Sequence, residues 1–191
     1  MNKLSLLLSR NWFCISMFII AFIYLLFPNN NLTIDSIGYG CCVKYGEDLF
    51  LSHHLFYNYF NYLLYNLFSY VIHGLDVLKF MQFTNGVFSL LCLLMLHKII
   101  IKQTQNFLKA HIWTIFVASS FGLMRFAVES ETYIIPIFFS LLSSYFYFSY
   151  LKKEKLKYVL FCSVFASIAC LFHQISIFWG IGLFIGFLQT R

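Results

Sequence analysis

Long apolar segments separated by short polar turns dominate the chain. A helix that crosses a bilayer needs about 20 predominantly apolar residues, and several segments reach or approach that length. Another segment, 54–70, is apolar but carries polar residues at regular intervals. The pattern predicts an all-α, polytopic integral membrane protein with about six transmembrane helices and a juxtamembrane helix in the first outer loop. The expected spans are 12–27, 80–101, 112–128, 132–151, 158–172 and 175–188.

The segment 54–70 stands apart because its polar residues recur with helical spacing. His54, Asn58, Asn61 and Tyr65 follow one another at steps of four, three and four, so they share one face of a helix. Such a helix either crosses the membrane, lies at its surface or lines a cavity. We favour the surface position, because the charges of the later turns then alternate consistently between the two sides.

The composition argues against a water-soluble domain. Hydrophobic residues make up 61% of the 191 residues and charged residues only 10%, whereas soluble domains carry roughly 25% charged residues. A formal charge of +6 would suggest a nucleic-acid partner in a soluble protein. Here the basic residues stand in short runs between apolar segments, where they act as topology signals. We therefore expect membrane lipid and no nucleic acid among the partners.

The charged residues alternate between successive turns. With both termini in the cytoplasm, ten of the thirteen Lys and Arg lie inside and six of the seven acids lie outside. This agrees with the positive-inside rule and predicts a multi-pass protein of a bacterial inner or plasma membrane, with segment 12–27 as a retained signal anchor. The inside residues are Lys3, Arg10, Lys98, Lys102, Lys109, Lys152, Lys153, Lys155, Lys157 and Arg191; the outside acids are Asp35, Glu47, Asp48, Asp76, Glu129 and Glu131.

This topology brings Asp35, His54, Glu131 and His173 to the outer face. Ionisable side chains beside hydrocarbon are costly unless they are paired or solvated, so their collection on one face favours an aqueous cavity. Taken singly, each could instead cap a helix end, where backbone groups need polar partners. Taken together, the four residues favour a functional site.

Arg125 lies in the last turn of the third expected span. It can extend its side chain to the interface, bind a phosphate, or pair with Glu129 four residues on. The sequence leaves these alternatives open.

A metal site is not predicted. Asp35, Glu47 and Asp48 could hold a divalent cation, but a solvated loop is the better explanation because oxygen-ligand sites need a defined cage. The six cysteines show no metal-ligand spacing. No cofactor is therefore expected with certainty, and a divalent cation is the one that the sequence leaves open.

Three short motifs resemble those of a known superfamily. Asp35-Ser36-Ile37-Gly38-Tyr39 resembles a first-loop motif with an Asp and a Tyr a few residues later. His53-His54-Leu55-Phe56-Tyr57 resembles the opening of a juxtamembrane helix, where relatives often have His-Pro. Glu131-Thr132-Tyr133 resembles an acidic-x-Tyr motif, and His173-Gln174 falls at a similar outer turn. In this order the motifs resemble the GT-C membrane glycosyltransferases, most closely the protein O-mannosyltransferase-like proteins.

The resemblance implies transfer of a sugar from a polyprenyl-phosphate-type lipid donor to an acceptor at the outer membrane face. It implies Asp35 as the catalytic base, and Arg125, His54 and His173 as groups that meet the lipid phosphate. Glu131 would position acceptor or sugar hydroxyls, and Tyr133 belongs to the same motif. Residues 1–191 would form a single transmembrane domain, the N-terminal part of a larger membrane enzyme.

Two other classes of function remain open. A transporter or channel would explain ionisable residues near the membrane, although no Gly/Pro-interrupted pair of helices is evident in the sequence. A non-catalytic assembly subunit would explain the apolar helices without any chemistry. Solute flux would favour the first, and stable co-purification with a larger membrane enzyme the second.

Overall fold

The computed structural model describes the backbone of residues 3–189 and the side chains of residues 11–189. Over the described residues the chain is all-helical and forms no strand, which confirms the all-α fold class. The elements are α1 (Lys3–Leu26), α2 (Ile34–Tyr45), α3 (Tyr57–Ser69), α4 (Val77–Thr104), α5 (Phe107–Ala118), α6 (Phe121–Ala127), α7 (Ile134–Lys153), α8 (Leu156–Phe172), the 3-10 turn η1 (Gln174–Ser176) and α9 (Ile177–Gln189).

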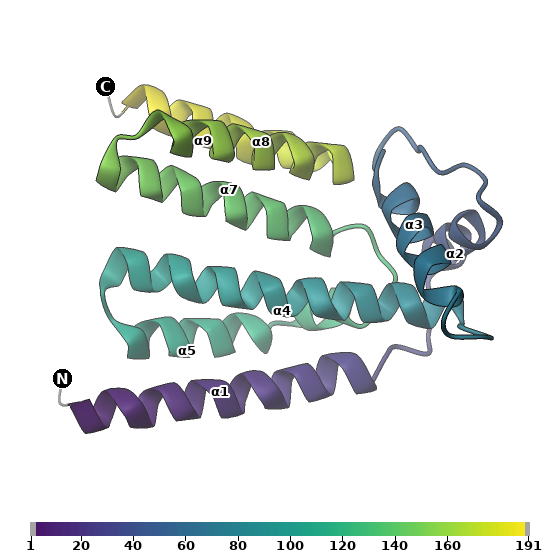
Figure 1. The fold of residues 1–191 in the computed structure, drawn as a ribbon, viewed down its shortest axis with the longest axis horizontal. Coiled ribbons are helices and arrows are strands. Elements are labelled where there is room, and N and C mark those ends of the chain that lie inside the picture. The colour runs from purple at the N-terminus through teal and green to yellow at the C-terminus, as the bar shows by residue number, and fades with distance from the viewer. Residues whose placement is uncertain (1–2, 190–191) are drawn as a thin grey trace.

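The long helices form a bundle that is closed at one end by α2 and α3. Figure 1 shows α1, α4, α5, α7, α8 and α9 running along the long axis, with α2 and α3 across one end. We call this end the cap end. The loops that join α4 to α5 and α7 to α8 lie at the opposite end, here called the lysine end. At the centre, α4 packs against α1, α5, α6 and α7.

The two ends of the bundle differ in charge, as the sequence pattern predicts. The cap end carries Asp35, Glu47, Asp48, Asp76, Glu129 and Glu131, and the lysine end carries Lys98, Lys102, Lys109, Lys152, Lys153, Lys155 and Lys157, together with Glu154. The side chains of Lys3 and Arg10, and all of Arg191, lie outside the described residues. The segregation follows from the alternating direction of successive helices, which returns every second turn to the same end.

Two helices of the described chain are long and apolar enough to cross a membrane. They are α4, with 28 residues, and α7, with 20 residues. At a rise of about 1.5 Å per residue, α7 is about 30 Å long, which matches the hydrocarbon core of a bilayer. The bent pair α5 and α6 raises the number to three if it is a single span. Three further apolar helical segments of the described residues are shorter: Asn11–Leu26 within α1, Leu156–Phe172 and Gln174–Gln189.

The third expected span, 112–128, is not one continuous helix. It is divided between α5 and α6, which meet at 66°. Ser119 and Ser120 form the break, and their hydroxyl groups donate to the carbonyl oxygens of Ile115 and Val117. Serine hydroxyls that bond to nearby carbonyl groups compete with the helix ladder and bend helices. The sequence search for glycine and proline therefore missed this break.

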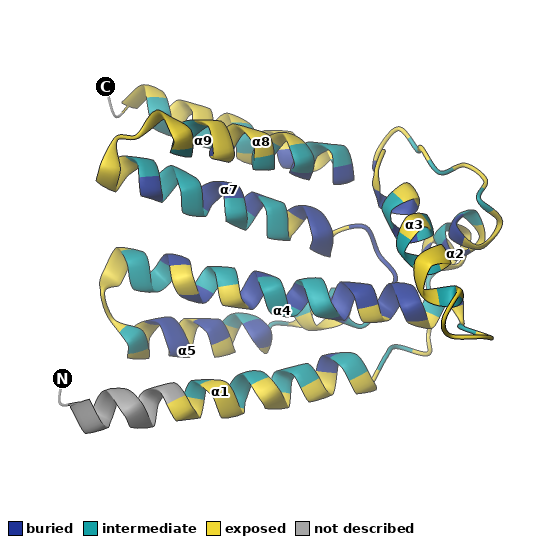
Figure 2. Ribbon diagram, in the orientation of Figure 1, coloured by how far each residue is buried: buried dark blue, intermediate teal, exposed yellow. Residues whose placement is uncertain are grey.

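The juxtamembrane segment 54–70 forms a shorter helix than expected. It begins at Tyr57, so His54 precedes it, and its 13 residues span only about 20 Å, too short to cross a bilayer. The polar stripe points inward: Asn58 and Asn61 are fully buried, whereas Leu63 and Leu67 on the remaining surface are exposed. Figure 2 shows this mixed burial of α3 at the cap end.

The polar stretch before α3 contains a helix that the sequence pattern did not reveal. Helix α2 begins where the hydroxyl oxygen of Thr33 accepts a hydrogen bond from the backbone N–H of Ser36, the usual role of a threonine cap. It ends at Gly46, whose φ of 72° suits a left-handed cap. Asp35 lies in its first turn, where a carboxylate is favoured by the helix dipole.

Candidate functional site

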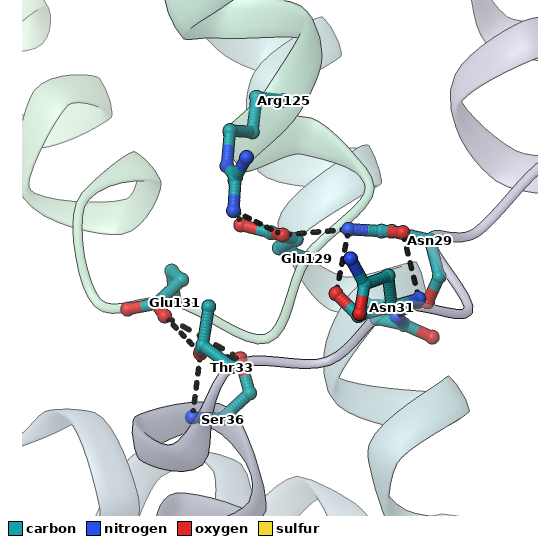
Figure 3. Close-up of polar contacts among 8 residues, drawn as sticks. Asn29, Asn31, Thr33, Ser36, Arg125, Glu129 and Glu131 are labelled. Carbon is teal, nitrogen blue, oxygen red and sulfur yellow. Dashed lines mark hydrogen bonds and ion pairs between the residues drawn. The ribbon is translucent and has the colours of Figure 1, made fainter.

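The loop between α6 and α7 is held in place by the carboxylate of Glu129. Arg125 donates to it through Nη2 at 3.0 Å and Nε at 3.2 Å, and the Asn29 amide donates at 2.6 Å. Glu129 is only 1% exposed, so these partners replace the water it has lost. Figure 3 shows the three side chains meeting. Of the three alternatives for Arg125, the structure shows the pair with Glu129.

Glu131, two residues further on, joins the same loop to the start of α2. Its Oε1 accepts a hydrogen bond from the Thr33 hydroxyl at 2.6 Å and lies 3.4 Å from the Ser36 hydroxyl. Thr33 is also the residue that caps α2. Glu131 therefore fixes the helix turn that carries Asp35. Figure 3 shows Glu131 beside Thr33 and Ser36.

Two amides from the middle of the bundle complete this network. The Asn85 amide donates to the carbonyl oxygens of both Glu129 and Glu131, each at 2.7 Å, and Gln82 donates to the carbonyl oxygen of Asn29 at 2.7 Å. Both side chains belong to α4 and both are buried. Buried backbone carbonyl groups need such partners, so α4 dictates the path of the loop.

Asp35 is exposed on the first turn of α2. The ion pair of Arg125 with Glu129 is the only one formed among residues 11–189, so the Asp35 carboxylate is not in a salt bridge. Its neighbour Ser36 is fully buried and faces Glu131. The side chains of Asp35 and Ser36 therefore lie in different surroundings, one exposed and one buried. An acid held in a defined place but without an ion-pair partner is available to accept a proton.

Tyr39 lies one helical turn beyond Asp35 and packs against His54 and Tyr57. Its ring centroid is 4.8 Å from that of His54 and 5.7 Å from that of Tyr57. Burial, followed by the negative charges of Asp35 and Glu131 and the nearby Tyr133, raises the pKa of Tyr39 to about 12. The phenol is therefore protonated at neutral pH and can donate a hydrogen bond.

His54, His173 and Tyr133 form an aromatic row beside Tyr39. Tyr133 stacks on His173 with 5.2 Å between ring centroids, and His173 lies 6.3 Å from His54. Burial is the main cause that lowers the pKa of both histidines, with a further contribution from the neighbouring imidazoles. Both are therefore neutral near pH 7. The Nε2 atom of His54 is buried without a hydrogen-bond partner in the described structure.

Backbone hydrogen bonds hold this row together. The N–H of Gln174 donates to the carbonyl oxygen of His53 at 3.0 Å, and the N–H of Phe56 donates to that of Leu171 at 2.9 Å. The side chains of Gln174 and His53 also meet, with 2.8 Å between Nε2 and Nδ1. The segment before α3 is thus tied to the end of α8 and to the turn that follows it.

The geometry brings most of the sequence candidates together. Tyr39 contacts His54 and is influenced electrostatically by Asp35, Glu131 and Tyr133, and His173 packs beside His54 and Tyr133; we call these six residues the Tyr39 cluster. Arg125 stands apart from it, connected through Glu129. The sequence analysis overlooked the supporting residues Asn29, Thr33, Gln82 and Asn85. Two of them could have been noticed in the sequence: Gln82 and Asn85 are polar residues within an apolar helix, and such residues need buried hydrogen-bond partners.

Three cavities of the described chain lie away from the Tyr39 cluster. They are bounded by α7, α8 and α9, by α4 and α5, and by the ends of α1, α3 and α4. Across residues 11–189, no group of three or more His, Cys, Asp or Glu side chains has an arrangement that could hold a metal ion. The cluster itself offers two carboxylates, two imidazoles that are neutral near pH 7 and two phenols.

Comparison of the chain with models of protein families, with curated proteins and with solved structures finds no match.

Proposed function

We propose that this chain carries out glycosyl transfer from a polyprenyl-phosphate-type lipid donor to an acceptor hydroxyl at the cap end of the bundle. One observation carries the proposal. Residues from separate parts of the chain, each within a motif that resembles the GT-C superfamily, converge around Tyr39. The proposal places the cap end on the outer side of a bacterial inner or plasma membrane, with six helical passes and both termini in the cytoplasm.

Asp35 acts as the general base in this mechanism. The acceptor oxygen attacks the anomeric carbon of the donor, and the bond between that carbon and the phosphate oxygen breaks. The electron pair leaves with the lipid phosphate, and the acceptor proton moves to the Asp35 carboxylate. The exposed position of Asp35, without an ion-pair partner, supports this role because the carboxylate needs no rearrangement to receive the proton.

The remaining residues bind the donor. His54 and His173 are neutral near pH 7, so each imidazole can donate one N–H to a phosphate oxygen. Tyr133 and Glu131 meet sugar or acceptor hydroxyls, and the half-exposed Arg125 adds positive charge at the edge of the site. Glu131 has a second role, because its hydrogen bond to Thr33 positions the helix that carries Asp35.

The test uses the chain reconstituted in proteoliposomes with a polyprenyl phosphate that carries a labelled sugar. The proposal predicts that label leaves the lipid fraction in a protein-dependent manner and appears on a hydroxyl acceptor or in water. Binding of the donor without any release of label, across several sugars and acceptors, would contradict it.

A transporter is the second candidate, and the break between α5 and α6 favours it. Transporters commonly place their substrate sites at interrupted helices, and the 66° bend at Ser119 and Ser120 is such an interruption. Uptake of a labelled solute into the same proteoliposomes, with no release of sugar from the lipid donor, would favour transport over transfer.

A further inference from the structure

A groove at the cap end, outside the Tyr39 cluster, has the features of a phospholipid site. It lies between the end of α1, the end of α3 and the start of α4 and has a volume of about 530 Å³. This is within the roughly 300–1,000 Å³ range of ligand cavities. Its walls are almost wholly apolar and include Leu26, Phe68, Ile72 and Phe83, each about half exposed. No residue of the Tyr39 cluster lines it.

The loop beside this groove exposes large apolar side chains. Tyr70 is 86% exposed and Val71 75% exposed, and Leu67 in the preceding turn is exposed as well. Figure 2 shows the loop between α3 and α4 as exposed. Apolar side chains next to a tyrosine are typical of segments that rest in the headgroup region of a bilayer. The groove therefore opens where lipid is available.

Two opposite charges lie at and beside the groove, close to each other on the first turn of α4. Lys79 lines the groove and is exposed, and Asp76 lies one helical turn before it. The Asp76 carboxylate accepts a hydrogen bond from the backbone N–H of Lys79 at 2.9 Å, but the two side chains form no salt bridge. The groove thus has a cation in its wall and an anion about one turn of helix away.

We propose that this groove binds one phospholipid with a primary ammonium headgroup, of the phosphatidylethanolamine class. The Lys79 ammonium group meets the lipid phosphate, the Asp76 carboxylate accepts hydrogen bonds from the lipid ammonium group, and one acyl chain lies along Phe68 and Phe83. A choline headgroup presents no N–H donor to Asp76, and an anionic glycerol headgroup meets that carboxylate with no positive charge. The site is independent of the proposed sugar transfer and rests only on membrane insertion.

The experiment measures lipid retained by the purified chain of residues 1–191. The protein in detergent is mixed with equal amounts of phosphatidylethanolamine, phosphatidylcholine and phosphatidylglycerol, and adducts are counted by native mass spectrometry. The proposal predicts a single preferred adduct with phosphatidylethanolamine. Lys79→Met should weaken its retention about tenfold, because a charge-assisted hydrogen bond contributes about 1.4 kcal/mol or more. The matched control is Lys44→Met, an exposed lysine of the cap end outside the groove.

A second variant distinguishes recognition of the headgroup from non-specific binding of any phospholipid to the groove. Asp76→Asn keeps a good helix cap, so α4 should fold as before. It should abolish the preference for the ethanolamine headgroup over choline while leaving choline lipid retention unchanged. Equal retention of all three lipids by the unaltered chain, a preference for phosphatidylglycerol, or no effect of Lys79→Met would overturn the proposal.

Discussion

Glu131 accepts a hydrogen bond from Thr33 across 98 residues of sequence, at 2.6 Å. This bond joins the loop before α7 to the cap of α2, the helix that carries both Asp35 and Tyr39. The helix that carries the proposed base is therefore positioned by a buried acid that itself belongs to a candidate motif.

Replacement of Glu131 tests this link. Glu131→Ala removes the buried carboxylate that accepts the Thr33 hydroxyl and should lower the free energy of unfolding by about 1–3 kcal/mol. Glu131→Gln retains an amide oxygen at the same position and should recover a large part of that loss. Thermal unfolding followed by circular dichroism in detergent measures both. Equal destabilisation by alanine and glutamine would show that the acceptor oxygen is not what matters.

Asn85 should be the most sensitive polar residue of α4. Asn85→Leu removes the donor to two buried carbonyl oxygens and should destabilise the protein by about 2–4 kcal/mol, from two unmet hydrogen bonds. The control is Ser89→Ala one turn later, because the buried Ser89 hydroxyl has no partner in the described structure. Its removal should leave the midpoint of unfolding unchanged or slightly raised. If Ser89→Ala lowered the free energy of unfolding more than Asn85→Leu does, this would contradict the hydrogen-bond network of Asn85.

The pair of Arg125 and Glu129 should behave as a coupled unit. Arg125→Met leaves the almost fully buried Glu129 carboxylate without its cation, and we expect a loss of about 2 kcal/mol, since the arginine itself is half exposed. In the double variant Arg125→Met/Glu129→Gln the loss should be smaller than the sum of the two single effects. Additive losses in this double-mutant cycle would mean that the pair contributes no interaction energy.

Stability should fall as the pH is lowered below about 6.5, the ordinary pKa of histidine. In the folded chain, burial lowers the pKa of His54 and His173, so the unfolded chain takes up protons at a higher pH than the folded chain does. Stability then decreases with falling pH until the folded-state pKa values are passed. Unfolding midpoints measured from pH 8 to pH 5 should show a shallower decline in His54→Gln/His173→Gln. The exposed His73→Gln serves as control and should keep the full decline.

The sequence predicted the parts of the fold that depend on local pattern. Apolar runs and charge alternation located the bundle helices and the two differently charged ends, because helix direction follows from the order of spans and turns. The same pattern missed α2, whose start depends on a single Thr33 hydroxyl, and the break after Ala118, which two serines produce. Both features arise from side-chain hydrogen bonds that hydropathy does not register.

The sequence predicted which residues belong to the candidate site, but not the hydrogen bonds that hold them in place. Asp35, His54 and His173 meet because the topology returns their segments to one end. The partners of Glu131 and Asn85 could not be inferred, because those contacts join residues 44 to 98 positions apart and depend on how the helices pack.

The most direct test compares sugar release by Asp35→Asn with that by Glu47→Gln. Both substitutions remove one exposed carboxylate from the cap end, but only Asp35 belongs to the Tyr39 cluster. Loss of a general base typically lowers a rate by about 10²–10⁴-fold, so Asp35→Asn should release label at least 100-fold more slowly than the unaltered chain. Glu47→Gln should match the unaltered chain. Equal release by both variants, at equal membrane levels, would contradict the proposed function of Asp35 and of the site around Tyr39.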